Sequence, residues 1–200
     1  MPRTPVIALP SDIRARLGAW WFIGSLVIFF ISSILLYGIY AYSRRDDPFR
    51  NATLPLSFLV STVCLIAISG MVHAATRAVR RDRWAKTSWL LSNSTVVAIG
   101  FLAIQVLAML QMLDETVVNP GNGRGVLGMV IVLAFLHALH VAGGVISLGV
   151  VAFGSAIGRY DHERHFAVDF AAQYWHFLDL VWLAMLLAFW TTTGGFQFGL

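Results

Sequence analysis

The sequence carries little charge: Asp, Glu, Lys and Arg account for 12% of its 200 residues, whereas hydrophobic residues account for 58%. Soluble domains average about 25% charged residues, so this composition excludes an ordinary soluble protein. A single cysteine, Cys64, excludes a framework of disulfides. The chain also contains no glycine-rich phosphate loop, no CxxC or HExxH motif and no nucleophile triad. We therefore expect a membrane protein that crosses the bilayer several times.

Five apolar stretches are long enough to cross a bilayer, because a transmembrane helix needs about 20 apolar residues. Charged or turn-forming segments separate them. The sequence therefore predicts an all-α fold, a polytopic membrane protein whose five transmembrane helices form one domain over residues 1–200. The first sixteen residues are predicted to form a polar, extended lead. The predicted spans are Leu17–Tyr42, Leu54–Ala75, Ser88–Leu113, Val126–Ile157 and Phe170–Thr192.

Lysine and arginine are distributed unevenly between the two sides of this predicted bundle. The side of the N-terminus carries ten of them and the opposite side carries four. Cytoplasmic segments of membrane proteins carry the excess of basic residues. We therefore predict a cytoplasmic N-terminus and a C-terminus outside the cytoplasm. The four on the opposite side are Arg44, Arg45, Arg50 and Arg124.

Ionisable side chains occur inside two of the predicted spans. His137 and His140 lie three residues apart on the fourth span, and His176 and Asp179 lie three residues apart on the fifth. Residues at this spacing share one helix face, and charge is costly in lipid, so His176 and Asp179 are expected to face protein. Three interpretations remain open: haem ligation as in a membrane cytochrome, a metal site built from all four residues, and structural pairing between helices. Structural pairing is the interpretation that we favour.

Asp169 lies at the cytoplasmic start of the fifth span. A carboxylate at a helix N-terminus interacts favourably with the helix dipole, and this role is sufficient to explain it. The alternative is a proton-collecting cluster with His162, Glu163 and His165.

Four sequence blocks on four different spans carry a resemblance to a known family. HALHV at residues 137–141, followed by Gly143 and Gly144, lies on the fourth span, and DFAAQYWHFLD at 169–179 lies at the start of the fifth. GSLVIFF at 24–30 lies on the first span, and FL at 101–102 with Gln105 lies on the third. In this order the blocks resemble cytochrome c oxidase subunit III, in its five-helix bacterial form.

The resemblance implies which residues are scaffold residues and where this chain departs from the family. Two glutamates of the family pattern are replaced here, by Leu26 and Ala108, so the proton-linked roles proposed for them do not carry over. The resemblance assigns no catalytic, cofactor-binding or metal-binding residue to the chain. The structural motif residues that it implies are His137, His140, Asp169, Tyr174, Trp175, His176 and Asp179.

The family also implies a function. We expect a non-catalytic accessory subunit of a haem–copper terminal oxidase, in the inner membrane of a bacterium. Its partners are expected to be the catalytic subunit I, which holds the haems and copper, other oxidase subunits and membrane lipid. An accessory subunit of nitric oxide reductase is the alternative within the family. A haem-binding membrane cytochrome is the alternative from a different class.

Overall fold

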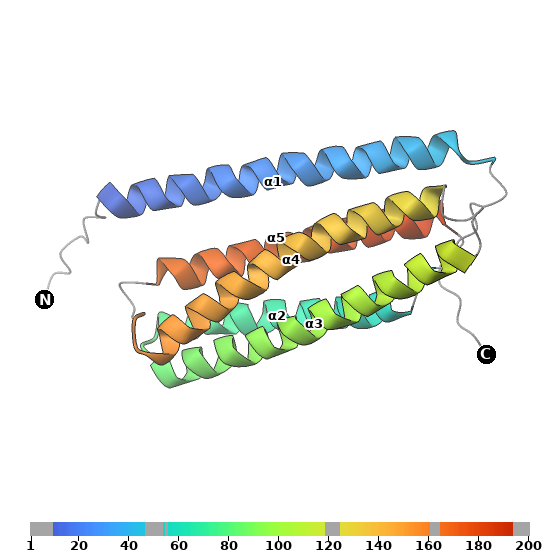
Figure 1. The fold of residues 1–200 in the computed structure, drawn as a ribbon. Helices are drawn as coiled ribbons and strands as arrows, with labels where there is room; N and C mark the ends of the chain where they lie inside the picture. Colours follow the sequence, from blue (N-terminus) through green and yellow to red (C-terminus); the bar gives the residue numbers. More distant parts are fainter. Residues whose placement is uncertain (1–9, 47–53, 55, 119–124, 161–164, 194–200) are drawn as a thin grey trace, which may run out of the picture.

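The computed structural model describes residues 10–46, 54, 56–118, 125–160 and 165–193 of the chain. Five α-helices account for nearly all of these residues (Figure 1). All five are long and apolar enough to cross a membrane, which confirms the predicted fold class. Their bounds are α1 Pro10–Ser43, α2 Ser57–Val79, α3 Trp84–Val118, α4 Val126–Ala156 and α5 Phe166–Thr192.

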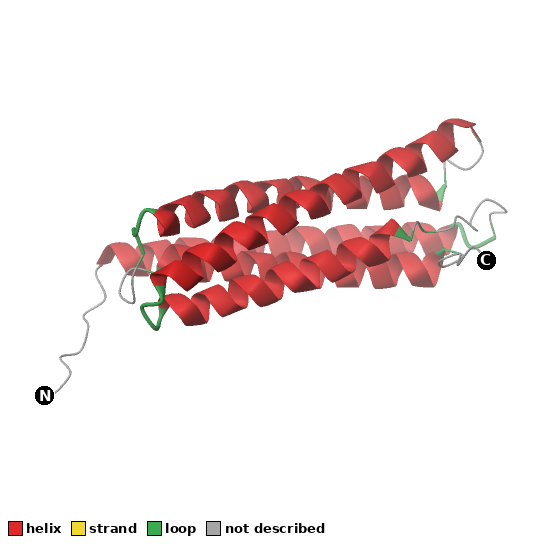
Figure 2. Cartoon of the chain, turned by 90° about the horizontal axis from the view of Figure 1, so that it is seen from below, coloured by secondary structure: helices red, strands yellow, loops and turns green. Residues whose placement is uncertain are grey.

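The helices form a ring of four with the fifth helix packed against one side. Each of α2, α3, α4 and α5 contacts two neighbours in the order α2–α3–α4–α5 and back to α2. Helix α1 lies along α4 and α5, on the side away from α2 and α3 (Figure 1). Seen from below, all five helices run roughly along one direction (Figure 2). This arrangement satisfies the backbone hydrogen bonds within each helix, as a bilayer requires.

Aromatic and aliphatic side chains fill the interior of the ring. Trp175, Trp182 and Phe58 are almost fully buried between the helices. The outward faces are also apolar, since Trp21 remains 79% exposed and Leu180 70% exposed. Large apolar side chains on both the inside and the outside are expected of a bundle surrounded by hydrocarbon, where no polar outer face is needed.

Helices α1, α3 and α5 extend beyond the predicted spans, whereas α2 is displaced by a few residues toward the C-terminus and α4 matches its span to within one residue. Helix α1 begins at Pro10, so the prediction of an extended lead is wrong for residues 10–16, while residues 1–9 lie outside the described part. Proline is favourable in the first turn of a helix, where no backbone N–H is needed. Helix α5 likewise begins at Phe166 and therefore includes Asp169. Hydropathy identifies the part of a helix that crosses the hydrocarbon layer, whereas the backbone hydrogen bonds of the helix continue beyond it.

A tight turn joins α2 to α3. Asp82 adopts a positive φ of 52°, and the Arg83 N–H donates a hydrogen bond to the Ala78 carbonyl oxygen at 3.0 Å. Aspartate is among the few residues other than glycine that tolerate this left-handed conformation. The turn reverses the chain within a few residues, so the basic ends of α2 and α3 lie beside each other.

Candidate functional site

A cluster of polar side chains lies at membrane depth where α2 meets α5. We call Ser69, His73, His176 and Asp179 the polar seam. The Ser69 hydroxyl is hydrogen-bonded to His176 Nδ1, and Asp179 lies one turn further along α5 on the same helix face as His176. The rings of His73 and His176 lie 5.9 Å apart.

The polar seam differs from the sequence-based expectation in its exposure. Both His73 and His176 are exposed, and Asp179 is half-buried. The prediction that this pair faces protein is therefore wrong for His176 in the single chain. The reason is helical geometry: Tyr174, Trp175 and Leu178 turn inward, which places His176 on the outer face.

The pairing between helices that we favoured is present for His176, through Ser69. Ser69 was not predicted from the sequence as a member of this site. A lone serine in an apolar helix commonly bonds its own backbone, and no spacing pattern connects α2 with α5. One oxygen of Asp179, Oδ1, is buried and has no hydrogen-bond partner among the described residues. The seam therefore retains unused hydrogen-bonding capacity.

His137 and His140 lie elsewhere, at the junction of α1, α4 and α5. His137 is fully buried, its ring stacks on Trp182 at 5.4 Å and it meets Phe30 edge-on at 6.1 Å. His140 contacts the same Phe30 ring at 4.9 Å, and its Nδ1 lies 2.7 Å from the Leu136 carbonyl oxygen of its own helix. The prediction that these histidines pair across helices is wrong, because aromatic rings of α1 and α5 surround them instead.

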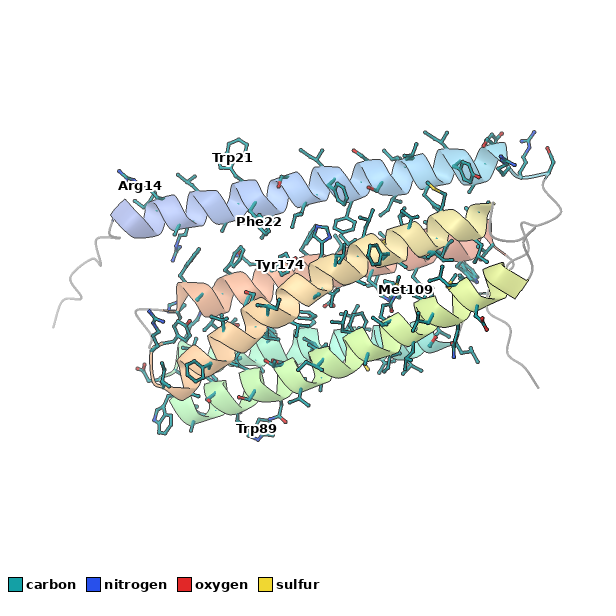
Figure 3. All side chains as sticks on the ribbon, in the orientation of Figure 1. Arg14, Trp21, Phe22, Trp89, Met109 and Tyr174 are labelled. Carbon is teal, nitrogen blue, oxygen red and sulfur yellow. The ribbon has the colours of Figure 1, made fainter. Side chains whose placement is uncertain are left out.

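Tyr174 and Trp175 pack against Gly144 of α4. The Tyr174 hydroxyl donates a hydrogen bond to the His140 carbonyl oxygen at 2.9 Å. A Cβ atom at Gly144 would lie 3.1 Å from the Tyr174 ring and 3.4 Å from Trp175. Glycine allows this close approach of α4 and α5, in which the aromatic side chains of α5 lie directly on the backbone of α4. Figure 3 shows Tyr174 between α1 and α5, near Phe22, and the two rings lie 6.1 Å apart.

Asp169 joins α5 to α2 at the end of the bundle where the chain begins. An Arg80 amino group lies 3.1 Å from both carboxylate oxygens, and His165 Nε2 lies 3.4 Å from Oδ2. Asp169 lies in the first turn of α5, as the helix-dipole interpretation requires, and the structure adds a second partner on another helix. His162 and Glu163, the other members of the alternative proton-collecting cluster, lie outside the described residues.

The two departures from the family pattern lie in apolar surroundings. Leu26 is partly buried and packs against the core, and Ala108 is almost fully buried. Among the described residues, no three His, Cys, Asp or Glu side chains are grouped so that they could hold a metal ion. The fold and its polar groups thus define a class: a multi-pass helical membrane protein with buried aromatic packing and a polar seam on its outer surface.

Comparison with known proteins identifies the family. The family model for cytochrome c oxidase subunit III matches residues 47–193, and the chain belongs to this family. Relatives named cytochrome c oxidase subunit 3 occur in Pylaiella littoralis, at 29% identity over 161 residues, and in Synechocystis, at 28% identity over 129 residues. These alignments cover 80% and 64% of the chain but 57% and 53% of the relatives, so the chain spans little more than half of their length.

A third relative matches over more of its own length. The protein of the same name from Thermostichus vulcanus is 26% identical over 172 residues, which covers 80% of this chain and 82% of the relative. The two cyanobacterial matches place bacterial proteins among the relatives.

Proposed function

We propose that the chain is a non-catalytic accessory subunit of a haem–copper terminal oxidase, in which oxygen reduction is coupled to proton translocation. In this role it stabilises catalytic subunit I and binds membrane lipid, and the haems and copper lie in partner subunits. The complex is an oxidoreductase of the respiratory chain that takes electrons from cytochrome c or quinol. The proposed location is a bacterial inner membrane, with the N-terminus cytoplasmic and the C-terminus periplasmic.

The polar seam is the observation that carries this proposal. Its two exposed histidines and its half-buried aspartate lie within membrane-spanning helices. An Asp at the centre of a transmembrane helix costs about 2.5–3.5 kcal/mol on insertion scales, and such groups are normally covered by protein. A transmembrane helix of another subunit that offers hydrogen-bond donors to Asp179 and the imidazoles would remove this cost.

The surroundings of His137 support a packing role over haem ligation. A haem needs an accessible imidazole nitrogen and room for the macrocycle beside it. The His137 ring is instead enclosed by Phe30 and Trp182 and is fully buried. Replacing these contacts by a macrocycle would require α1 to separate from α4 and α5.

Affinity purification of the tagged chain from its native membrane tests the proposal. We expect a haem–copper catalytic subunit to co-purify, with its haem absorption. Changing His73 and His176 together to Leu removes the imidazole groups that a partner helix would bond. Each membrane hydrogen bond contributes roughly 0.6–1.7 kcal/mol, so association should weaken about 3- to 20-fold per bond to the partner. The matched control is Asn93→Leu, because Asn93 is a polar residue of α3 that bonds only its own helix, at the Trp89 carbonyl oxygen.

Three outcomes of this experiment count against the proposal. Equal losses in the seam variant and in Asn93→Leu would mean that the seam is not the interface. Recovery of a nitric oxide reductase instead of an oxidase would move the chain to the other branch of the family. A haem bound at one per chain to the protein purified alone would replace the accessory role by an electron-carrying one.

A further inference from the structure

Four basic side chains surround one small pocket at the α2–α3 turn. The pocket has a volume of about 150 Å³, and its floor is formed by Ala74 and Ala78 of α2. We call this cavity, together with the four basic side chains that line it, the cationic pocket. They are Arg77, Arg81, Arg83 and Lys86.

The turn itself brings these four charges together. Arg77 lies in the last turn of α2 and Lys86 in the first turn of α3, while Arg81 and Arg83 lie in the short turn between the two helices. The tight connection through Asp82 brings all four side chains to the lining of one pocket. Four cations around so small a volume repel one another unless an anion lies between them.

The cationic pocket has no anion of its own among the described residues. Arg80, the neighbouring arginine, is already paired with Asp169, whereas the described residues include no ion pair to any of the four pocket cations. Asp82, the nearest acid in the sequence, lines a different cavity with Trp84 and Tyr160. The first turn of α3 holds no acidic residue either, although a helix N-terminus favours negative charge.

We propose that the cationic pocket binds the phosphate headgroup of an anionic phospholipid in the cytoplasmic leaflet. Basic pockets between transmembrane helices on this side of a membrane are suited to such headgroups. The inference deepens the proposed lipid-binding role and rests on the proposed orientation of the chain. The pocket phosphate would be held by charge-assisted hydrogen bonds from the guanidinium groups.

The surface below the pocket favours a lipid over a soluble phosphate. Ala74, Gly70 and Val63 lie on the face of α2 that carries Arg77, beside the seam residue His73, and Val63 is 68% exposed. Gly70 has open space beside it, because a Cβ atom at this position would meet nothing within 4 Å. Trp89 of α3 is 63% exposed and points away from the bundle (Figure 3), as aromatic residues at a membrane interface do. An acyl chain can therefore lie along α2 while its headgroup occupies the pocket.

Native mass spectrometry of the full chain in detergent tests this site directly. Dioleoyl phosphatidylglycerol is titrated against dioleoyl phosphatidylcholine, and we expect one tight site that prefers the anionic lipid. Each basic residue near a surface strengthens anionic lipid binding by about fivefold, so neutralising two in Arg77→Gln/Arg81→Gln should weaken binding by about 30-fold. The variant Arg83→Gln/Lys86→Gln, on the other helix, should show a similar loss.

The controls separate the site from general charge effects. Arg14→Gln/Arg159→Gln removes the same charge from the same side of the bundle but outside the pocket, and it should bind like the wild type. Arg77→Lys/Arg81→Lys keeps the charge and should retain most of the affinity, which guards against misfolding of the glutamine variants. In every double variant to Gln, eight basic residues remain on this side against four on the other, so the orientation is unchanged.

Two results would overturn the proposal. The first is an equal loss in the pocket variants and in Arg14→Gln/Arg159→Gln, which would show only a non-specific charge effect. The second is displacement of phosphatidylglycerol by millimolar inorganic phosphate, which would make the pocket a site for a soluble anion. The experiment uses the isolated chain, so failure to find an oxidase partner and failure to bind the lipid are separate outcomes.

Discussion

Gly144 and Gly143 are adjacent on α4 but have different surroundings, and this difference yields a sharp prediction. A Cβ at Gly144 would lie 3.1 Å from the Tyr174 ring, 3.2 Å from Leu178 and 3.4 Å from Trp175, whereas a Cβ at Gly143 has nothing within 4 Å. We predict that Gly144→Ala destabilises the bundle relative to Gly143→Ala. The two substitutions are otherwise matched in chemistry and in position along the helix.

The expected magnitude follows from two opposing terms. Replacing glycine by alanine in a helix is favourable by about 1 kcal/mol, and this gain is common to both variants. Overpacking a filled interior typically costs about 1–3 kcal/mol, and only Gly144→Ala incurs that cost. Tyr174 cannot move away freely, because its hydroxyl is bonded to the His140 carbonyl oxygen at 2.9 Å. The free energies of unfolding should therefore differ by about 1–3 kcal/mol, with Gly143→Ala the more stable.

Unfolding in mixed micelles by increasing fractions of dodecyl sulfate, followed by circular dichroism, measures this difference. Leucine at the same two positions should increase it, since a larger side chain fits in the open space beside Gly143 and not beside Gly144. Equal midpoints for the two alanine variants would refute the close approach of α4 and α5 on which the reasoning depends.

Two further predictions concern the hydrogen bonds and the orientation. Trp182→Phe removes the indole N–H that donates to Thr62 Oγ1 at 2.9 Å. The unfolding free energy should fall by roughly 0.6–1.7 kcal/mol for the lost hydrogen bond, with a further loss from poorer packing. Thr62→Val should lose only the hydrogen-bond part, and an unchanged unfolding free energy in both variants would contradict the contact. A reporter fused after Leu200 should be periplasmic and one inserted near Arg83 cytoplasmic, and finding both on one side would refute the orientation proposed from the basic residues.

The number and type of helices could be predicted from the sequence for two reasons. A transmembrane helix must match the thickness of the hydrocarbon layer, and all its backbone hydrogen bonds must be formed within the protein. Leu17–Tyr42 and the four other predicted stretches each correspond to one helix of the structure. The helix ends could not be predicted equally well. Helix α1 continues to Pro10 through polar residues, where hydropathy gives no signal although the backbone hydrogen bonds of the helix persist, and α5 begins before Asp169, whose charge marked the predicted boundary.

The candidate site was only partly predictable, for a different reason. His176 and Asp179 are evident in the sequence because ionisable residues are rare inside apolar runs. Their partner Ser69 lies more than a hundred residues earlier, and its contact with His176 depends on the α2–α5 packing, which no local pattern specifies. The surroundings of His137 are equally non-local, since Phe30 of α1 and Trp182 of α5 meet at its ring only after the bundle has formed.

The position of α1 has a consequence for how the protein is made. Only 11% of its apolar window is buried, compared with 33–39% for the other helices, and its main neighbours are α4 and α5. At its far end Tyr37 is hydrogen-bonded to Thr192, in the last turn of α5. Because the chain is made from its N-terminus, α1 enters the membrane before α4 and α5 have been synthesised. At about 5–20 residues per second, these neighbours follow on the order of ten seconds later. During that interval α1 is held by lipid alone, which explains why its sequence must be hydrophobic on every side.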